Sequence, residues 1–231
     1  MNDLFVVGTD TGVGKTVLSL VLMQYLHARN HRPFYIKPIQ TGCRDAYDTE
    51  SDAQFIYRHV GELKGKDCAG SVIYCFREPK APYFAARNEG AKIDPDYLAR
   101  EISARGAGYS PLVIEGAGGL LVPLAEGAMM IDLVARTGAS PLIAARAGLG
   151  TINHTLLTIE ALRRRGIEPQ GVVLLDAEKP GTDERMIEEN REAIEAASGV
   201  FVAGVIPRIV NFVQPLAFLF TLFDRLFSRK M

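Results

Sequence analysis

Cysteine is scarce in this sequence of 231 residues, and neither sign of charge is in excess. The three cysteines are Cys43, Cys68 and Cys75, and no two of them form a CxxC pair. An odd, widely spaced set is typical of reduced thiols in a cytosolic protein. Because 26 basic residues face 27 acidic ones, charge gives no indication of a nucleic-acid partner.

Long apolar runs are missing as well. No uninterrupted run approaches the ~18–20 residues of a membrane span, and the N-terminus has no basic segment or cleavage site of a signal peptide. The most apolar stretch, 216–223, lies in a helix expected at about 212–228. A short run without a basic face favours a helix buried on the core or at a subunit interface over a peripheral membrane helix. We therefore expect no stable membrane association.

Short apolar runs alternate with helical patterns along the whole chain. We expect strands at 4–8, 33–37, 111–115, 141–145, 171–175 and 201–206, and helices at 14–29, 51–60, 95–105, 129–137, 151–165 and 183–197. Continuous apolar strands suit a parallel sheet buried on both faces. The alternation predicts one α/β domain over 1–231, with a doubly wound, mainly parallel sheet and helices on both faces. Segment 61–93 shows no pattern.

The clearest motif follows the first expected strand. It reads Gly8-Thr-Asp-Thr-Gly-Val-Gly-Lys-Thr16 and opens a helix. Glycines let the backbone approach a phosphate, and N–H groups at the helix start point at the anion. In this P-loop NTPase-like arrangement Lys15 would bind the β- and γ-phosphates, and the Thr16 hydroxyl would bind Mg²⁺. The loop is one residue longer than the generic form.

Polar residues near the ends of other strands are further candidates, because ligands bind at the carboxyl edge of such sheets. Lys37 comes where the second expected strand ends, before Pro38, and can hold negative charge. Glu115 ends the third strand, where P-loop enzymes place a magnesium carboxylate, normally Asp. Asp52, at a helix start, is either a second magnesium carboxylate or an acid that complements the helix dipole.

The glycines after the third strand and the ends of the fourth, fifth and sixth strands complete the list of candidate sites. The glycines after Glu115 (Gly116-Ala-Gly-Gly119) indicate close approach of the backbone to a ligand. Segment 146–154 enters a helix and would form a second anion site, with Asn153 as a ligand or a simple first-turn polar residue. Asp176 follows the fifth strand, and Pro207 and Arg208 follow the sixth, as candidate walls of a base pocket.

Together these motifs resemble the dethiobiotin synthetase family. The resemblance rests on the P-loop and on four further segments in the same order and spacing, which are Lys37-Pro-Ile-Gln-Thr-Gly42, Ser51-Asp-Ala53, Glu115-Gly-Ala-Gly-Gly119 and Leu149-Gly-Thr-Ile-Asn-His154. It covers residues 1 to about 208, and the longer loop is a feature of the family. The family implies a cytoplasmic ATP-dependent ligase of biotin biosynthesis. Its substrates are 7,8-diaminopelargonic acid, carbon dioxide and ATP, its metal is Mg²⁺, and it forms a homodimer.

The resemblance also implies roles for individual residues. Lys15 and Lys37, with Thr11 in the loop, would act on the phosphates and the carbamate, and Thr16, Asp52 and Glu115 would hold Mg²⁺. Thr41 would lie near the diamine, and Asn153 would reach the substrate carboxylate across a two-fold dimer. The implied nucleotide-binding residues are Gly12, Val13, Gly14, Lys15, Thr16, Val17, Asp52, Glu115, Gly116, Ala117, Gly118, Asp176, Pro207 and Arg208.

Two departures from the family pattern and one rival class remain. Gly12 stands where some relatives carry an acidic residue, and Leu175 stands where relatives have an Asn that contacts adenine beside the retained Asp176. The rival is a deviant P-loop ATPase switch of the partition or division-site type. Those proteins carry a signature lysine at the position that Asp10 occupies here.

Overall fold

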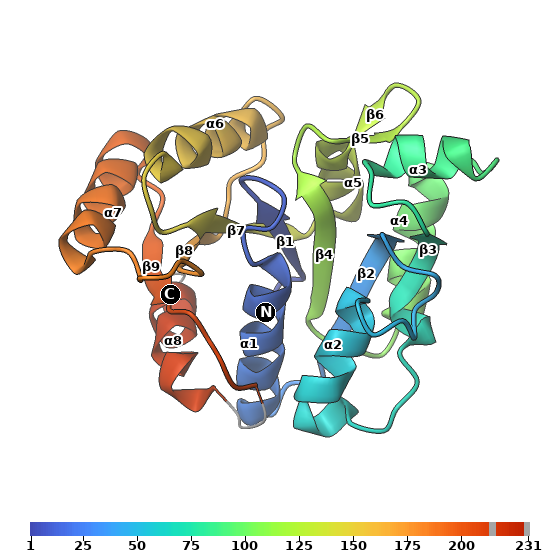
Figure 1. The fold of residues 1–231 in the computed structure, drawn as a ribbon, viewed down its shortest axis with the longest axis horizontal. Helices are drawn as coiled ribbons and strands as arrows, with labels where there is room; N and C mark the ends of the chain where they lie inside the picture. The colour runs from blue at the N-terminus through green and yellow to red at the C-terminus, as the bar shows by residue number, and fades with distance from the viewer. Residues whose placement is uncertain (213–215, 229–231) are drawn as a thin grey trace.

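A seven-stranded parallel sheet forms the centre of the molecule (Figure 1). The computed structural model describes residues 1–212 and 216–228. The strand order is β3-β2-β4-β1-β7-β8-β9. The strands are β1 (Leu4–Gly8), β2 (Phe34–Thr41), β3 (Val72–Phe76), β4 (Leu112–Gly119), β7 (Ser140–Arg146), β8 (Gly171–Leu175) and β9 (Val202–Ile206). Because the strands are parallel, all their carboxyl ends lie at one edge.

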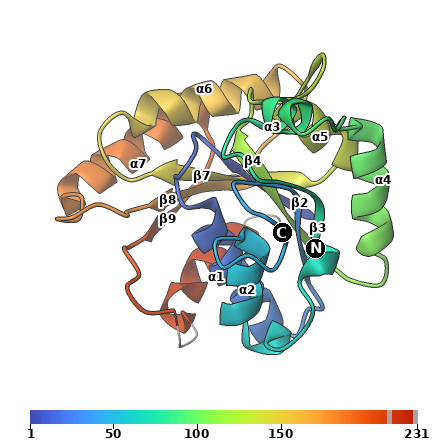
Figure 2. The same cartoon turned by 45° about the vertical axis from the view of Figure 1, so that its right-hand side comes forward.

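Helices cover both faces of this sheet (Figure 2). One face carries α1 (Lys15–Ala28), α2 (Asp52–His59) and α8 (Phe220–Ser228), and the other carries α3 (Pro82–Asn88), α4 (Pro95–Arg105), α5 (Met130–Thr137), α6 (Thr151–Arg163) and α7 (Glu184–Ser198). A small antiparallel hairpin of β5 (Pro123–Ala125) and β6 (Ala128–Met129) follows β4. The predicted fold class, a doubly wound parallel sheet with helices on both faces, is confirmed.

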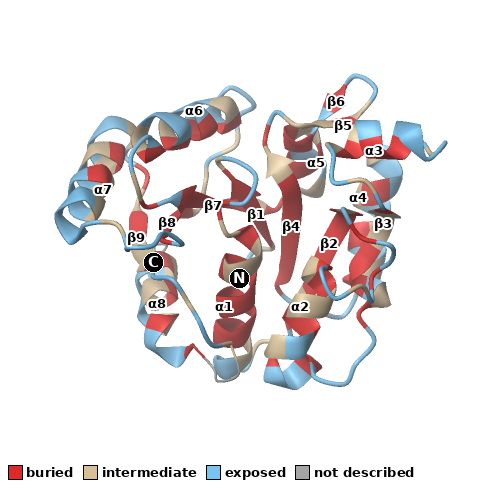
Figure 3. Cartoon of the chain, in the orientation of Figure 1, coloured by how far each residue is buried: buried red, intermediate tan, exposed pale blue. Residues whose placement is uncertain are grey.

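Alternation along the strands builds two separate cores. In β1, Leu4 and Val6 face the core under α1, whereas Phe5 and Val7 face the core under the opposite helices. Every residue of β1 is buried (Figure 3). A strand covered on both faces gains burial from every side chain, which is why the run is apolar throughout and does not alternate with polar residues.

The predicted element boundaries need three corrections. β2 continues past Lys37 to Thr41, and β4 continues past Glu115 to Gly119, so both charged residues lie inside strands. Segment 61–93 contains β3 and α3, which the sequence pattern did not reveal. β3 is a short edge strand with a partly exposed middle, and α3 is only seven residues long. Both are too short to show a clear period.

The C-terminal helix begins later than predicted. The segment preceding α8 has a 3-10 turn at Ala217–Leu219, and residues 213–215 of the predicted helix lie outside the described part of the chain. α8 packs on α1, with the Tyr25 and Phe223 rings 5.2 Å apart. Arg29 donates to both carboxylate oxygens of Asp224. The apolar residues of α8 therefore cover this chain's own core, and within the described residues no helix is long and apolar enough to cross a membrane.

Truncation of Phe223 tests this packing. Phe223 is fully buried, whereas Phe218 is 66% exposed. We expect Phe223→Ala to lower the free energy of unfolding by about 3–5 kcal/mol, because it removes a ring from a packed core. Phe218→Ala is the matched control and should stay within about 0.5 kcal/mol of wild type. Urea unfolding followed by circular dichroism measures both. Equal effects of the two changes would contradict the packing of α8.

Candidate active site

The P-loop connects β1 to α1 at the carboxyl edge of the sheet. Gly14 begins the helix with φ 97°, a conformation that strongly favours glycine. A Cβ atom on Gly8 would lie 2.8 Å from both Lys15 Nζ and the Asp10 carbonyl oxygen. The Lys15 side chain therefore folds back over the loop, where its ammonium donates to the Asp10 carbonyl at 3.1 Å. Only glycine at position 8 leaves room for this arrangement.

A charged cluster of four residues lies beside the loop, and we call it the Lys37 cluster: Thr16, Lys37, Asp52 and Glu115. Lys37 Nζ donates to Asp52 Oδ2 at 2.8 Å, to Glu115 Oε1 at 2.9 Å and to the Gly116 carbonyl at 3.1 Å. All three donors of the ammonium are thus used within the protein. Lys37 is 5% exposed and Glu115 is 1% exposed, so this is a buried ion network.

A split in the sheet makes room for the cluster. β2 pairs with β4 only from Phe34 to Ile36, and from Lys37 onward it pairs with β3 alone. Pro38 has no N–H to donate, so a proline is tolerated where the ladder to β4 has ended. The two strands separate at this point, where Lys37 Nζ bonds the Glu115 side chain and the Gly116 carbonyl of β4. The proline that the sequence analysis interpreted as a strand exit is the residue at which the sheet divides.

Asp52 reaches the cluster from the first turn of α2. Ser51 caps this helix, and the Asp52 N–H donates to the buried Gln40 side chain at 3.1 Å. Gln40 thereby joins the end of β2 to the start of α2. Because the Asp52 carboxylate bonds Lys37 and Thr16, it does more than complement the helix dipole. These contacts favour a site position for Asp52, and its role as a magnesium carboxylate stays a prediction.

The electrostatics of the cluster follow from burial and pairing. Burial alone would lower the pKa of Lys37, but the carboxylates of Glu115 and Asp52 outweigh it and raise that pKa. Burial would raise the pKa of Asp52, but the Lys37 charge lowers it. Burial, and then the charge on Lys37, lower the pKa of Lys15 to about 8. Lys37 is therefore a permanent cation, whereas Lys15 titrates near neutral pH.

The Thr16 hydroxyl is in contact with two carboxylates at once. Its oxygen lies 2.8 Å from Asp52 Oδ1 and 2.9 Å from Glu115 Oε1. A hydroxyl has one proton to donate, so it can satisfy only one of these two acceptors. Three oxygens, two of them anionic, thus converge on one point at the start of α1.

The other predicted residues divide into two groups. Thr11 is exposed on the loop, Thr41 is half-buried at the end of β2, and Asn153 is exposed in the first turn of α6. Val13 is buried beneath the loop, and Gly12, Gly14, Val17, Gly116, Ala117 and Gly118 lie in or next to the P-loop and the end of β4. All of these residues border the carboxyl edge, and their roles stay predictions.

The predicted base pocket is less open than expected. Asp176 accepts hydrogen bonds from the Thr182 N–H and hydroxyl at 2.9 and 3.0 Å, so its carboxylate holds its own loop together. Leu175 packs against the P-loop, where its Cγ would lie 3.0 Å from a Cβ on Gly14. Pro207 and Arg208 follow β9 and are exposed. Leu175 therefore meets the loop with apolar atoms only.

Two residues of the site were missed at the sequence level. Tyr35 is completely buried and donates its hydroxyl to Glu115 Oε2 at 3.0 Å, and burial raises its pKa well above the ordinary value. Gln40 positions Asp52 as described above. The sequence did indicate Tyr35, because it lies two residues before Lys37, and side chains two residues apart in a strand lie on the same face. Beyond Pro38 the alternation breaks, since Ile39 packs in the core on the opposite face of the sheet, and no sequence pattern indicates the bond of Gln40 to the start of α2.

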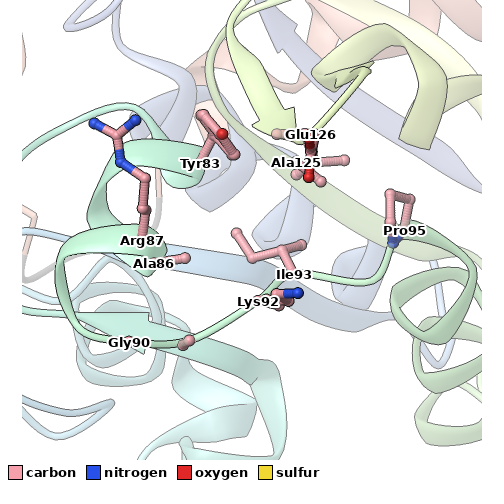
Figure 4. Close-up of a pocket in the computed structure, with 11 residues that line it drawn as sticks. Tyr83, Ala86, Arg87, Gly90, Lys92, Ile93, Pro95, Ala125 and Glu126 are labelled. Atoms are coloured by element: carbon pink, nitrogen blue, oxygen red, sulfur yellow. The ribbon is translucent and has the colours of Figure 1, made fainter.

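A cavity of 510 Å³ lies between α3 and the β5–β6 hairpin (Figure 4). Ile93 and Ala86 form an apolar part of its lining, and the charged residues Arg87 and Glu126 also line it. None of the residues that line it belongs to the predicted site or to the Lys37 cluster. The cavity is a separate feature of segment 61–93 and the hairpin.

This combination of a parallel sheet, a P-loop at its first strand and a buried lysine–carboxylate cluster defines a P-loop ATPase. A family model described as an AAA domain matches residues 2–215. Among solved structures, a cell division ATPase MinD from Pyrococcus furiosus aligns with a TM-score of 0.58 and 13% identity over 100% of both chains. A ParA family ATPase from Chlorobium tepidum gives a TM-score of 0.55 and 12% identity, covering 90% of this chain and 84% of that one. At such identities the likeness shows the fold alone.

Curated relatives are closer in sequence. An ATP-dependent dethiobiotin synthetase BioD from Paramagnetospirillum magneticum is 40% identical over 94% of this chain and 89% of its own length. The protein of the same name from Brucella anthropi is 40% identical over 91% of this chain and 89% of its own. The chain belongs to the ATP-dependent dethiobiotin synthetase family. The resemblance seen in the motifs is thereby confirmed.

The lowered pKa of Lys15 gives a prediction for nucleotide binding. In the free protein Lys15 is protonated below a pKa of about 8 and loses its charge above it. We expect the affinity for ADP, measured without divalent metal, to be constant below pH 8. Above pH 8 the Kd should rise, approaching tenfold per pH unit, because binding must then take up a proton.

Isothermal titration calorimetry between pH 6.5 and 9.5 measures this dependence. Lys15→Met is the control, and its weaker binding should not change over the same range. A flat wild-type profile up to pH 9.5 would contradict the lowered pKa.

Proposed function

We propose that this chain catalyses the ATP-dependent ring closure of 7,8-diaminopelargonic acid with carbon dioxide to dethiobiotin. One amino group adds to carbon dioxide and loses a proton, which gives a carbamate. A carbamate oxygen attacks the γ-phosphorus of ATP, and ADP leaves. The second amino group then attacks the carbonyl of the mixed anhydride, and phosphate leaves. The observation that supports this best is Lys37, a buried permanent cation beside the P-loop, in a chain 40% identical to enzymes of that name.

The proposed reaction depends mainly on positively charged groups at fixed positions. Both the phosphoryl transfer and the acyl substitution gather negative charge near the γ-phosphate, so preorganised donors stabilise the transition states. We assign this role to Lys15 and Lys37, together with Thr11 and the backbone N–H groups of the loop. Thr41, at the end of β2, would orient the diamine. Since every donor of Lys37 is used within the protein, binding a phosphate or carbamate oxygen must exchange at least one of these bonds.

The residues around Thr16 fit Mg²⁺. Octahedral ligands at about 2.0–2.1 Å from this ion lie about 2.9 Å apart, and the Thr16 hydroxyl lies 2.8 and 2.9 Å from the two carboxylate oxygens. Over residues 1–212 and 216–228 no three His, Cys, Asp or Glu side chains form a metal-holding group. That suits an ion that takes one or two carboxylates and otherwise waters and phosphates. When bound, Mg²⁺ would neutralise charge on the phosphates, held by Thr16, Asp52 and Glu115.

The direct test supplies the purified protein with diaminopelargonic acid, ¹³C-bicarbonate, ATP and Mg²⁺. We expect dethiobiotin with one ¹³C atom in mass spectrometry, and one ADP formed for each ring. Omission of the diamine should abolish ADP formation. ATP hydrolysis that continues without the diamine and yields no labelled product would contradict the proposal and favour an ATPase switch.

Replacing Lys37 tests the catalytic assignment. Lys37→Ala leaves two carboxylates without their cation, and breaking a buried pair in this way costs about 3–5 kcal/mol of stability. We therefore add Lys37→Gln, which keeps amide donors in the cluster. Both variants should lower kcat by about 10²–10³ or more, the effect of removing a preorganised donor to developing charge.

The rate is compared only for protein that is folded by circular dichroism at the assay temperature. A folded Lys37→Gln variant that keeps half of the wild-type turnover would show that Lys37 is structural.

We also propose that the chain works as a homodimer. Three leucines near the site are exposed, namely Leu121 by 64%, Leu149 by 91% and Leu157 by 55%. Leu121 and Leu157 line a cavity of 260 Å³ together with P-loop residue Asp10. Apolar side chains grouped beside a catalytic loop favour a covering partner, and a second copy would bring its Asn153 to the substrate carboxylate. Because α8 covers its own core, it is no longer an argument for this interface.

Light scattering should give twice the mass of the chain, and Leu157→Asp should shift the population toward monomer and raise the KM for the diamine. Leu149→Asp changes a second exposed leucine, and its effects on mass and KM are compared with those of Leu157→Asp. A fully active wild-type monomer would contradict the dimer.

Nucleotide choice is the property in which this chain should differ from its relatives. Leu175 is 6% exposed and lies against Gly14, so it cannot donate to or accept from a base. Apolar contact and shape alone discriminate about 10–200-fold, whereas a hydrogen-bonding site reaches about 10⁴–10⁵. We expect GTP and CTP to support turnover with kcat/KM within roughly two orders of magnitude of ATP.

Leu175→Asn is the matched variant and should increase the preference for ATP. A wild-type preference for ATP above about a thousandfold would show that other groups, such as the main chain at Pro207 and Arg208, select the base.

A further inference from the structure

Gln24 links three segments of the chain on the side of α1 that faces α2. Its side chain is 7% exposed. The amide nitrogen donates to the His59 carbonyl, in the last turn of α2, at 2.9 Å. The amide oxygen accepts from the N–H of Leu216, in the C-terminal segment, also at 2.9 Å. One buried amide thus joins α1, α2 and the C-terminal segment.

The same two helices carry ligands of the proposed metal site at their other ends. α1 begins with Lys15 and Thr16, and α2 begins with Asp52. The helices run side by side in both views of the fold (Figures 1 and 2). Two polar contacts therefore join them: Thr16 to Asp52 at their N-terminal ends, and Gln24 to His59 about two helical turns away.

These two contacts respond differently when a metal ion is bound. The first exists because the Thr16 hydroxyl can donate to Asp52. If both oxygens are ligands of one ion, the ion itself links the two helix starts, and the Thr16 hydroxyl keeps its proton to donate. The second contact does not involve the site and stays in place. It holds α2 beside α1 whether or not an ion is bound, and thereby sets the position of Asp52 relative to Thr16 before the ion arrives.

We propose that Gln24 is a positioning residue for the metal site and acts through α2 on Asp52. This inference rests on the proposed role of Asp52 as a magnesium ligand. The C-terminal segment supports the same end of α2, since His59 Nδ1 lies 3.2 Å from the Phe212 carbonyl and the Phe55 and Phe212 rings are 5.2 Å apart. Phe212 and Leu216, to which the sequence motifs gave no role, therefore help to hold α2 in place beside the site.

Two substitutions of Gln24 separate its contacts. Gln24→Glu keeps an acceptor for the Leu216 N–H but removes the donor to His59. Gln24→Leu removes both. The matched control is Asp224→Asn, which weakens the exposed ion pair of α8 with Arg29 on α1 and leaves α2 untouched. Asp52→Asn tests whether Asp52 itself is a ligand of the metal ion.

The readout is metal binding without turnover. Mn²⁺ serves as the probe, its affinity for the protein–ADP complex is followed by electron paramagnetic resonance, and ADP binding without metal is measured in parallel. We expect Gln24→Glu and Gln24→Leu to weaken Mn²⁺ binding about three- to tenfold, the factor that one net hydrogen bond represents. Metal-free ADP binding and the Asp224→Asn variant should match wild type. Urea unfolding confirms that each variant is folded under these conditions.

Three outcomes overturn the inference, and they are distinguishable. If Asp52→Asn weakens Mn²⁺ binding but both folded Gln24 variants match wild type, Gln24 only packs the helices together. If Asp52→Asn also binds Mn²⁺ like wild type, Asp52 is no ligand, and the proposed metal site falls together with the role of Gln24. Equal weakening of metal-free ADP binding would likewise show a general loss of structure instead of positioning.

Discussion

The buried contact of Lys37 with Asp52 and Glu115 is the interaction on which the rest of the site depends. Glu115 is 1% exposed and the Asp52 side chain is 26% exposed, and an unpaired buried charge is strongly destabilising, so Glu115 above all depends on the cation beside it. The pairing in turn fixes the geometry around it. β2 and β4 must separate to hold it, α2 must begin where Asp52 can reach it, and Thr16 must lie within hydrogen-bond distance of both acids.

This arrangement explains how one protein can hold so much charge at the site that we propose for phosphates. The ammonium groups of Lys15 and Lys37 are balanced by Asp52 and Glu115, so the Lys37 cluster and Lys15 together are close to neutral before any ligand binds. The two lysines nevertheless differ, because the paired one stays charged and the less compensated one titrates near pH 8. A site prepared in this way can exchange internal bonds for bonds to phosphate without first burying a bare charge.

Much of this was readable from the sequence, for identifiable reasons. The six strands with continuous apolar runs and the P-loop were predicted because burial on both faces and a glycine-rich helix start leave strong patterns. The short β3 and α3 left no such pattern. The position of Lys37 was misjudged because Pro38 indicates the end of a ladder, and the sequence cannot tell one neighbouring strand from two. Gln24 and Gln40 act through contacts between distant segments, which local patterns do not encode.

The most direct test of the central claim is a crystal structure of the protein with Mg²⁺ and a non-hydrolysable ATP analogue. The account predicts a metal ion about 2.0–2.1 Å from Thr16 Oγ1, with the carboxylates of Asp52 and Glu115 directed at it and Lys37 Nζ within hydrogen-bond distance of a γ-phosphate oxygen. A complex in which Lys37 keeps its three bonds to Asp52, Glu115 and Gly116 and touches no phosphate would contradict it.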